Sequence, residues 1–152
     1  MATLISHSPA ETEALGERWG KAAVSGLVIG LTGELGTGKT QLVKGIARGL
    51  GVTGRVHSPS FTLVNEYDGG RLQLFYLDLY RLDTPEQIIA AGLEEYFYEP
   101  NGIAVIEWAE RWFGRAPSFE FRVSSKSVRY RRVQIETLGE NERRITYENL
   151  GA

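Results

Sequence analysis

The chain has 152 residues, 42% of them hydrophobic and 24% charged, an ordinary balance for a globular protein that we interpret as one domain, residues 1–152. The sequence contains no cysteine, which excludes disulfides, thiol catalysis and thiolate metal sites, and its net charge of −2 gives no global attraction to nucleic acid. No apolar run approaches the roughly 20 residues that cross a bilayer, and the first residues lack a signal-peptide pattern. We therefore expect a cytoplasmic protein without a membrane contact.

The first third of the chain predicts a helix, a strand and a second helix. Ser8-Pro9-Ala10-Glu11 combines an N-cap serine, a proline at the first helical position and a capping-box glutamate, and this helix is expected to reach about Val24. The short apolar run 27–31 is typical of a buried parallel strand. It leads directly into a glycine-rich loop, after which residues 39–50 predict the next helix.

The remainder of the chain predicts a hairpin, a helix and several strands. Segments 61–67 and 71–79 flank Asp68-Gly69-Gly70, which is a strong hairpin signal. A helical region is expected to start at Thr84 and to end near Tyr98, and a buried strand is expected over 103–106. Alternating residues predict further strands at 119–123, 128–137 and 144–147. The predicted fold class is α/β, a P-loop NTPase-like mixed sheet with antiparallel additions, flanked by helices.

The glycine-rich loop carries a phosphate-binding motif. Residues 33–40 match G-x-x-x-x-G-K-[ST] in full, with a predicted strand before the loop and a helix after it. Glycines let backbone N–H groups approach a polyphosphate closely, and the helix N-terminus adds its positive dipole end. We expect Lys39 to contact the β- and γ-phosphates of ATP and the Thr40 hydroxyl to bind magnesium (Mg2+). The predicted nucleotide-binding residues of the loop are Glu34, Leu35, Gly36, Thr37, Gly38, Lys39 and Thr40.

Two carboxylates follow predicted buried strands. Glu107 comes directly after the strand 103–106, and Asp78 ends the hydrophobic stretch 74–77. A P-loop nucleotide site needs a carboxylate for its magnesium ion, commonly at the end of a buried strand. The sequence therefore predicts Glu107 as a magnesium ligand, and Asp78 together with Glu107 and Lys39 as the catalytic residues.

Four segments together resemble one family. They read Gly-Glu-Leu-Gly-Thr-Gly-Lys-Thr-Gln-Leu-Val-Lys-Gly at 33–45, Ser-Pro-Ser-Phe-Thr-Leu-Val-Asn-Glu-Tyr at 58–67, Leu-Asp-Leu-Tyr-Arg-Leu at 77–82 and Ile-Glu-Trp-Ala-Glu-Arg at 106–111. In this order the chain is similar, over about residues 8–150, to the bacterial ATPase of tRNA threonylcarbamoyladenosine synthesis, TsaE. The resemblance implies that ATP hydrolysis supports threonylcarbamoyl transfer onto the adenosine just 3′ of the anticodon. It also implies partners of the TsaB and TsaD types, with tRNA reached only through their complex.

The resemblance also assigns roles by position. It implies phosphate contact by Lys39, magnesium binding by Thr40 and Glu107, and help from Asp78 in the metal shell or in placing the attacking water. Residues 58–61 would form a switch-like loop that senses the γ-phosphate, and Thr12 lies where the family's N-terminal segment approaches the base or ribose. The family often has histidine where this chain has Tyr76 and threonine where it has Ser60, so we assign no proton-transfer role to Tyr76.

Two other interpretations remain open on the sequence. A P-loop small-molecule kinase would use the same loop, although such kinases carry an arginine-bearing lid that this chain does not display. A nucleic-acid-binding module could instead use the basic residues of the C-terminal strands, although exposed arginines are more often only solvated. These residues are Arg129, Arg131, Arg132, Arg143 and Arg144. Trp108, next to Glu107, is interpreted as a core or interface aromatic rather than as part of the site.

Overall fold

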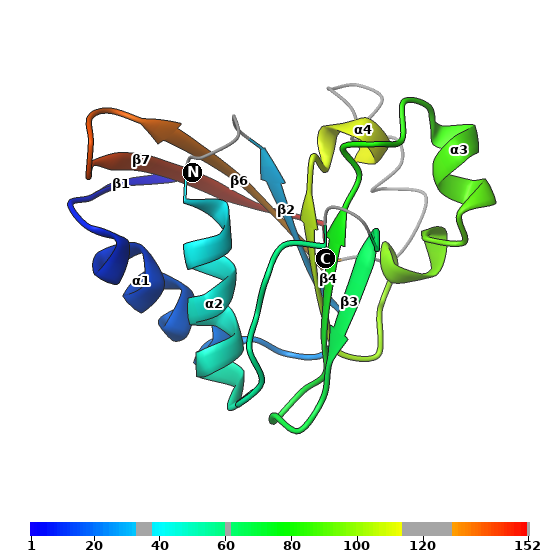
Figure 1. Cartoon of the computed structure of the whole chain (residues 1–152), viewed down its shortest axis with the longest axis horizontal. Helices are drawn as coiled ribbons and strands as arrows, with labels where there is room; N and C mark the ends of the chain where they lie inside the picture. Colours follow the sequence, from blue (N-terminus) through cyan, green and yellow to red (C-terminus); the bar gives the residue numbers. More distant parts are fainter. Residues whose placement is uncertain (33–37, 60–61, 114–128, 152) are drawn as a thin grey trace.

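The computed structural model of the chain describes residues 1–32, 38–59, 62–113 and 129–151. Its elements alternate between strands and helices before closing on a C-terminal hairpin (Figure 1). In chain order they are β1 (Ala2–Ser6), α1 (Pro9–Ala22), β2 (Leu27–Thr32), α2 (Lys39–Leu50), β3 (Val64–Tyr67), β4 (Leu74–Asp78), α3 (Pro85–Ala90), the 3-10 helix η1 (Glu94–Tyr96), β5 (Ile103–Glu107), α4 (Glu110–Phe113), β6 (Arg129–Thr137) and β7 (Arg143–Gly151).

The strands form one seven-stranded mixed sheet in the order β1-β7-β6-β2-β5-β4-β3. The four central strands β6, β2, β5 and β4 are parallel, whereas β3 and the β7–β1 pair add antiparallel strands at the two edges. This confirms the predicted fold class, an α/β sheet with antiparallel additions. Because parallel strands end on the same side, the carboxyl ends of β2, β5 and β4 meet at one edge of the sheet.

The helices α1 and α2 pack side by side on one face of the sheet (Figure 1). Their contact is unusually close, because glycines on both helices meet the partner's backbone. A Cβ added at Gly16 would lie 2.2 Å from the carbonyl oxygen of Leu42, and one added at Gly45 would lie 2.0 Å from that of Glu13. No larger side chain fits these positions without separating the helices. The phosphate-loop helix is thereby fixed against α1.

The other face of the sheet is covered by α3, η1 and α4. There the Phe97 ring packs on Trp112 and meets Phe113 edge-on, and the ring centroids of Phe113 and of Tyr130 on β6 are 4.3 Å apart. Ile88 of α3 is fully buried in the same cluster. Both faces of the central strands are therefore buried, as continuous apolar runs in parallel strands require.

The structure matches the N-terminal predictions closely and departs from others. Ser8 caps α1 by accepting from the backbone N–H of Glu11, whose carboxylate accepts from the N–H of His7. The helical region expected over 84–98 is divided in two: α3 ends at Ala90, because Gly92 adopts a left-handed backbone with φ +77°, and η1 follows at Glu94–Tyr96. The N-terminal strand β1 was not predicted, and the strand expected at 119–123 lies outside the described residues.

In the ranges that the structure describes, no helix is long and apolar enough to cross a bilayer.

Candidate functional site

Two carboxylates lie together where β4 and β5 end. Asp78 and Glu107 are the last residues of their strands and face each other in the strand register. Both are buried, with 7% and 6% of their surface exposed. Side chains alternate between the faces of a strand, and Tyr76 and Val105 belong to the core cluster under α2. Asp78 and Glu107 therefore lie on the face of the sheet that carries the phosphate-loop helix.

The helix α2 begins beside these carboxylates. Gly38 is its N-cap and has a left-handed backbone, φ +95°, which favours glycine at that position. Lys39 is 4% exposed, and its charge acts on Glu107. Thr40 is half-buried at the first turn. The predicted phosphate-loop residues Glu34, Leu35, Gly36 and Thr37 lie outside the described residues, so the structure brings together Lys39, Thr40, Asp78 and Glu107 of the predicted site.

Glu107 has a pKa that its surroundings in the site raise above the ordinary carboxyl value. Burial raises its pKa, and the nearby charge of Asp78 raises it further. Hydrogen bonds from Tyr76 and Ser58 and the charge of Lys39 act in the opposite direction. The ionised carboxylate is therefore held at the sheet edge at a cost in free energy, which a bound cation would relieve.

Tyr76 is a site residue to which the sequence assigned no role. Its side chain is fully buried, and its hydroxyl donates a hydrogen bond of 2.8 Å to Oε2 of Glu107. The Thr40 side chain hydrogen-bonds to the same hydroxyl. Burial and the charge of Glu107 raise the pKa of Tyr76 well above its ordinary value, so the phenol stays protonated. The signal in the sequence was its spacing of two from Asp78, which places both side chains on one face of β4.

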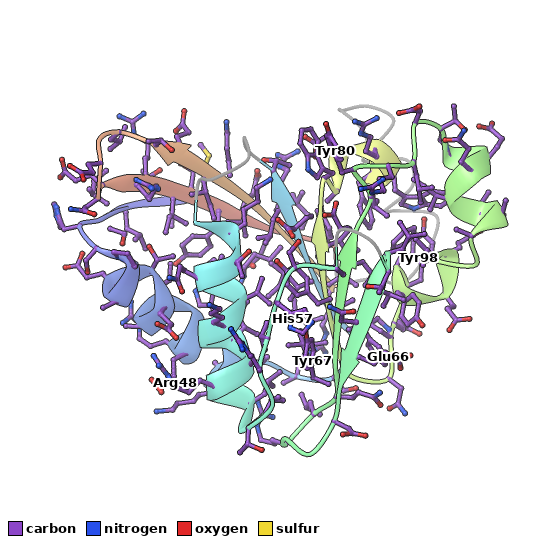
Figure 2. The ribbon with its side chains drawn as sticks, viewed as in Figure 1. Arg48, His57, Glu66, Tyr67, Tyr80 and Tyr98 are labelled. Carbon is purple, nitrogen blue, oxygen red and sulfur yellow. The ribbon has the colours of Figure 1, made fainter. Side chains whose placement is uncertain are left out.

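Trp108 packs against the core cluster on the α3 side of the sheet and also lies beside the site. Its backbone has a positive φ of +59°, a rare conformation for a bulky residue that marks strain. Its half-buried ring lies 5.0 Å from Nζ of Lys39, close enough for a cation–π contact, and 5.4 Å from the guanidinium of Arg111. Tyr80, which Figure 2 shows near the upper edge of the sheet, packs on Trp108 with ring centroids 5.1 Å apart.

The loop before β3 reaches the same site. Ser58 hydrogen-bonds to Glu107, and the carbonyl of Leu63 accepts from the backbone N–H of Asp78 at 3.0 Å. The segment is anchored farther down the sheet, where the Tyr67 hydroxyl contacts the backbone of His57 (Figure 2). The predicted switch-like loop 58–61 thus begins at a site carboxylate, although residues 60 and 61 lie outside the described residues.

Thr12 lies at the N-terminal side of the site, in α1. It is 2% exposed, and its hydroxyl is 2.7 Å from Oγ of Ser6 at the end of β1. In the register of the sheet Ser6 faces Arg143 of β7. A Cβ added at Gly38 would lie 3.8 Å from Nε of Arg143, which brings the start of β7 next to the phosphate loop. The Thr12 hydroxyl is thus already hydrogen-bonded to Ser6. A contact between Thr12 and a nucleotide stays a prediction.

The donor set of this edge fits a magnesium ion bound together with phosphate. Thr40 supplies a hydroxyl, and Asp78 and Glu107 supply carboxylates, the hard oxygen ligands that Mg2+ prefers. Within residues 1–32, 38–59, 62–113 and 129–151 no group of three or more His, Asp or Glu side chains forms a metal cage. An ion here would therefore complete its shell with phosphate and water oxygens, as is usual for Mg2+ in nucleotide sites.

Arg131, Arg132, Arg143 and Arg144 of the C-terminal strands each contact another group of the chain, and two of them form ion pairs. Arg132 pairs with Glu148 at 2.8 Å, and Arg144 pairs with Glu136 at 3.4 Å. Arg131 stacks over Trp19 and donates to Asn149, and Arg143 donates to carbonyls of the turn at 139–142. Arg132 and Arg144 are therefore each paired with an opposite charge of the same hairpin.

Comparison with known proteins agrees with this geometry. The protein is 35% identical to the tRNA threonylcarbamoyladenosine biosynthesis protein TsaE of Bacillus subtilis over 144 residues, which span 95% of this chain and 83% of that protein. It is 39% identical to the TsaE of Treponema pallidum over 79% of this chain and 87% of that protein. The match to a Nostoc TsaE is 47% identical, over 64% of this chain and 61% of that protein.

A solved structure and a family model also match the chain over most of its length. The crystal structure of Bacillus subtilis YdiB superposes with a TM-score of 0.73 at 30% identity, over 99% of this chain and 86% of that one. The family model described as threonylcarbamoyl adenosine biosynthesis protein TsaE matches residues 6–145. The sheet and the carboxylates at its strand ends are consistent with these matches. The chain belongs to the TsaE family of tRNA threonylcarbamoyladenosine biosynthesis.

Proposed function

We propose that this protein binds and hydrolyses ATP with magnesium in support of threonylcarbamoylation of the adenosine 3′ of the anticodon. One observation carries the proposal: a buried lysine at the start of the phosphate-loop helix lies beside two buried carboxylates at the ends of parallel strands. Lys39, Asp78 and Glu107 are each less than a tenth exposed. Buried charges destabilise a fold unless they are paired or serve a ligand, and this set complements a magnesium–triphosphate complex.

Each residue then has a distinct role. The Nζ atom of Lys39 binds the β- and γ-phosphates, and the backbone N–H groups of the loop hold the remaining phosphate oxygens. Thr40 and Glu107 hold the magnesium ion, which would neutralise charge on the phosphates. Asp78 completes the outer shell or orients the attacking water. Catalysis of phosphoryl transfer depends on such positioning and charge neutralisation rather than on a covalent step.

The hydrolysis is proposed to be slow until partner proteins bind. No arginine finger can be assigned within the described residues, and such a residue contributes roughly 10³- to 10⁵-fold in related phosphoryl transfers. TsaB-type and TsaD-type proteins are the proposed partners, and tRNA is reached through their complex. Because tRNA modification of this kind takes place where tRNA is matured, a cytoplasmic location is part of the proposal.

A steady-state ATPase assay tests this function. We expect slow turnover by the purified chain alone and a clear rate increase when the TsaB-type and TsaD-type pair is added. A fast rate that the pair leaves unchanged would contradict partner activation. Phosphorylation of a nucleoside or other metabolite in a substrate screen would instead support the small-molecule kinase.

A further inference from the structure

The hydroxyl of Tyr76 lies between the two predicted magnesium ligands. It donates to Oε2 of Glu107 at 2.8 Å, and the Thr40 side chain hydrogen-bonds to it from the start of α2. Three elements, α2, β4 and β5, are thus joined through one oxygen atom. The Tyr76 ring is fully buried among core residues of β4 and β5, so the position of that oxygen is fixed by packing.

The direction of these hydrogen bonds follows from elementary chemistry. A phenol has one proton to donate, and at Tyr76 the Glu107 carboxylate accepts it. The Thr40 hydroxyl must therefore donate its own proton to the Tyr76 oxygen. In this arrangement the Tyr76 hydroxyl uses neither the lone pairs of the Thr40 oxygen nor the second carboxylate oxygen of Glu107. The chain Thr40 to Tyr76 to Glu107 therefore orients both side chains without occupying these atoms, which a magnesium site needs.

We propose that Tyr76 is a positioning residue that holds Thr40 and Glu107 in their metal-binding arrangement before the cation arrives. The inference rests on the proposed function, because it assumes that these two side chains bind Mg2+ with ATP. Tyr76 itself touches neither the metal nor the phosphates. Its contribution is preorganisation, which removes the free-energy cost of ordering two ligands from different elements at the moment of binding.

The test compares Tyr76→Phe with Tyr130→Phe in the full chain. Phenylalanine keeps the buried ring and removes only the hydroxyl, and Tyr130 is an equally buried tyrosine, 2% exposed, in the core cluster on the other face. Binding of a non-hydrolysable ATP analogue is measured across a Mg2+ titration and again in EDTA. For Tyr76→Phe we expect the apparent Mg2+ affinity to fall about 10-fold, because a hydrogen bond to a charged group is lost. The affinity of Tyr76→Phe for the analogue in EDTA should stay within about 2-fold of wild type. For Tyr130→Phe, both the apparent Mg2+ affinity and the analogue affinity in EDTA should stay within the same limit.

A double-mutant cycle shows whether Tyr76 acts through Glu107. In a Glu107→Ala background, Tyr76→Phe should weaken Mg2+ binding by much less than in the wild type, since residues that act together are not additive. The proposal would be overturned if Tyr76→Phe weakened analogue binding equally in Mg2+ and in EDTA. It would also be overturned if the effects of Tyr76→Phe and Glu107→Ala on Mg2+ binding were fully additive, because Tyr76 would then have a merely structural role. If the wild-type chain bound no analogue at all, the proposed ATP site itself would be wrong, which is a separate outcome.

Discussion

The strand-end site and the β6–β7 hairpin are both rich in charged residues, yet they use charge in opposite ways. In the site, Lys39, Asp78 and Glu107 are almost completely buried. In the hairpin, Arg132 and Glu148 form a cross-strand pair whose side chains are 41% and 36% exposed, and the Arg144–Glu136 pair is similarly open. Sequence composition alone does not separate these two groups of charges.

The difference indicates which charges have a function beyond folding. Exposed ion pairs contribute about 0–1 kcal/mol each, and such pairs are common on β-sheets. A buried carboxylate beside a second carboxylate costs stability, as the raised pKa of Glu107 shows. A fold retains such an arrangement where binding of a ligand offsets the loss of stability. The buried charges of Lys39, Asp78 and Glu107 therefore indicate a binding site, whereas the exposed charges of the hairpin do not.

The largest expected effect comes from removing the buried cation. Lys39→Ala should weaken ATP binding roughly 10- to 100-fold, because a charge-assisted hydrogen bond to phosphate is lost. Lys44→Ala is the matched control, since Lys44 is an exposed lysine on the same helix. Isothermal titration calorimetry of both variants measures the difference. Wild-type affinity in the Lys39 variant would remove the phosphate loop from the mechanism.

Truncating Glu107 should separate function from folding. Glu107→Ala is expected to lower magnesium-dependent ATP turnover about 10-fold or more, because a ligand of the ion is lost. Its thermal unfolding should change far less, since Glu107 adds little favourable energy to the fold. ATPase rates across a Mg2+ titration, combined with unfolding curves, give both quantities. A variant that simply fails to fold would make Glu107 a structural residue.

A neutral isostere of Glu107 should stabilise the ligand-free protein. Folding raises the pKa of this carboxyl, so ionisation destabilises the fold: the penalty is absent below the ordinary carboxyl pKa and fully present above the folded-state pKa. Glu107→Gln should therefore raise the Tm at pH 8. The gain should shrink toward zero as the pH falls to the ordinary carboxyl pKa of about 4.5, which melting curves at several pH values would measure. A lower Tm of Glu107→Gln at pH 8 would contradict this prediction. It would mean that the charge of Lys39 and the hydrogen bonds from Tyr76 and Ser58 stabilise the ionised carboxylate by more than burial destabilises it.

The smallest effect is expected in the hairpin. Arg144→Ala should change the free energy of unfolding by less than about 1 kcal/mol, because its pair with Glu136 is solvent-exposed. It should leave ATP binding unchanged. Urea unfolding and a binding titration check both points. A strong, salt-dependent loss of tRNA binding in this variant would revive the interpretation of the C-terminal strands as a direct nucleic-acid surface.

The sequence by itself determined the elements around the phosphate loop. The motif at 33–40, the N-cap at Ser8 and the apolar run 27–31 are local signals, and the structure places β2, α1 and α2 as they predict. The proximity of Asp78 and Glu107 was also predictable, because residues that end neighbouring parallel strands meet at one edge. The break within the predicted helical region 84–98 was not predictable, because a helical pattern does not show that Gly92 leaves the helical conformation between α3 and η1.

Only the tertiary structure decided which side chains surround the two carboxylates. Tyr76 looks in the sequence like one more core aromatic, and its bridge between Thr40 and Glu107 depends on how α2 sits over β4 and β5. The ring of Trp108 lies over Lys39 because the backbone turns with a positive φ directly after the acid. Local sequence patterns specify secondary structure through spacing, whereas contacts between residues far apart in the chain depend on how the elements pack.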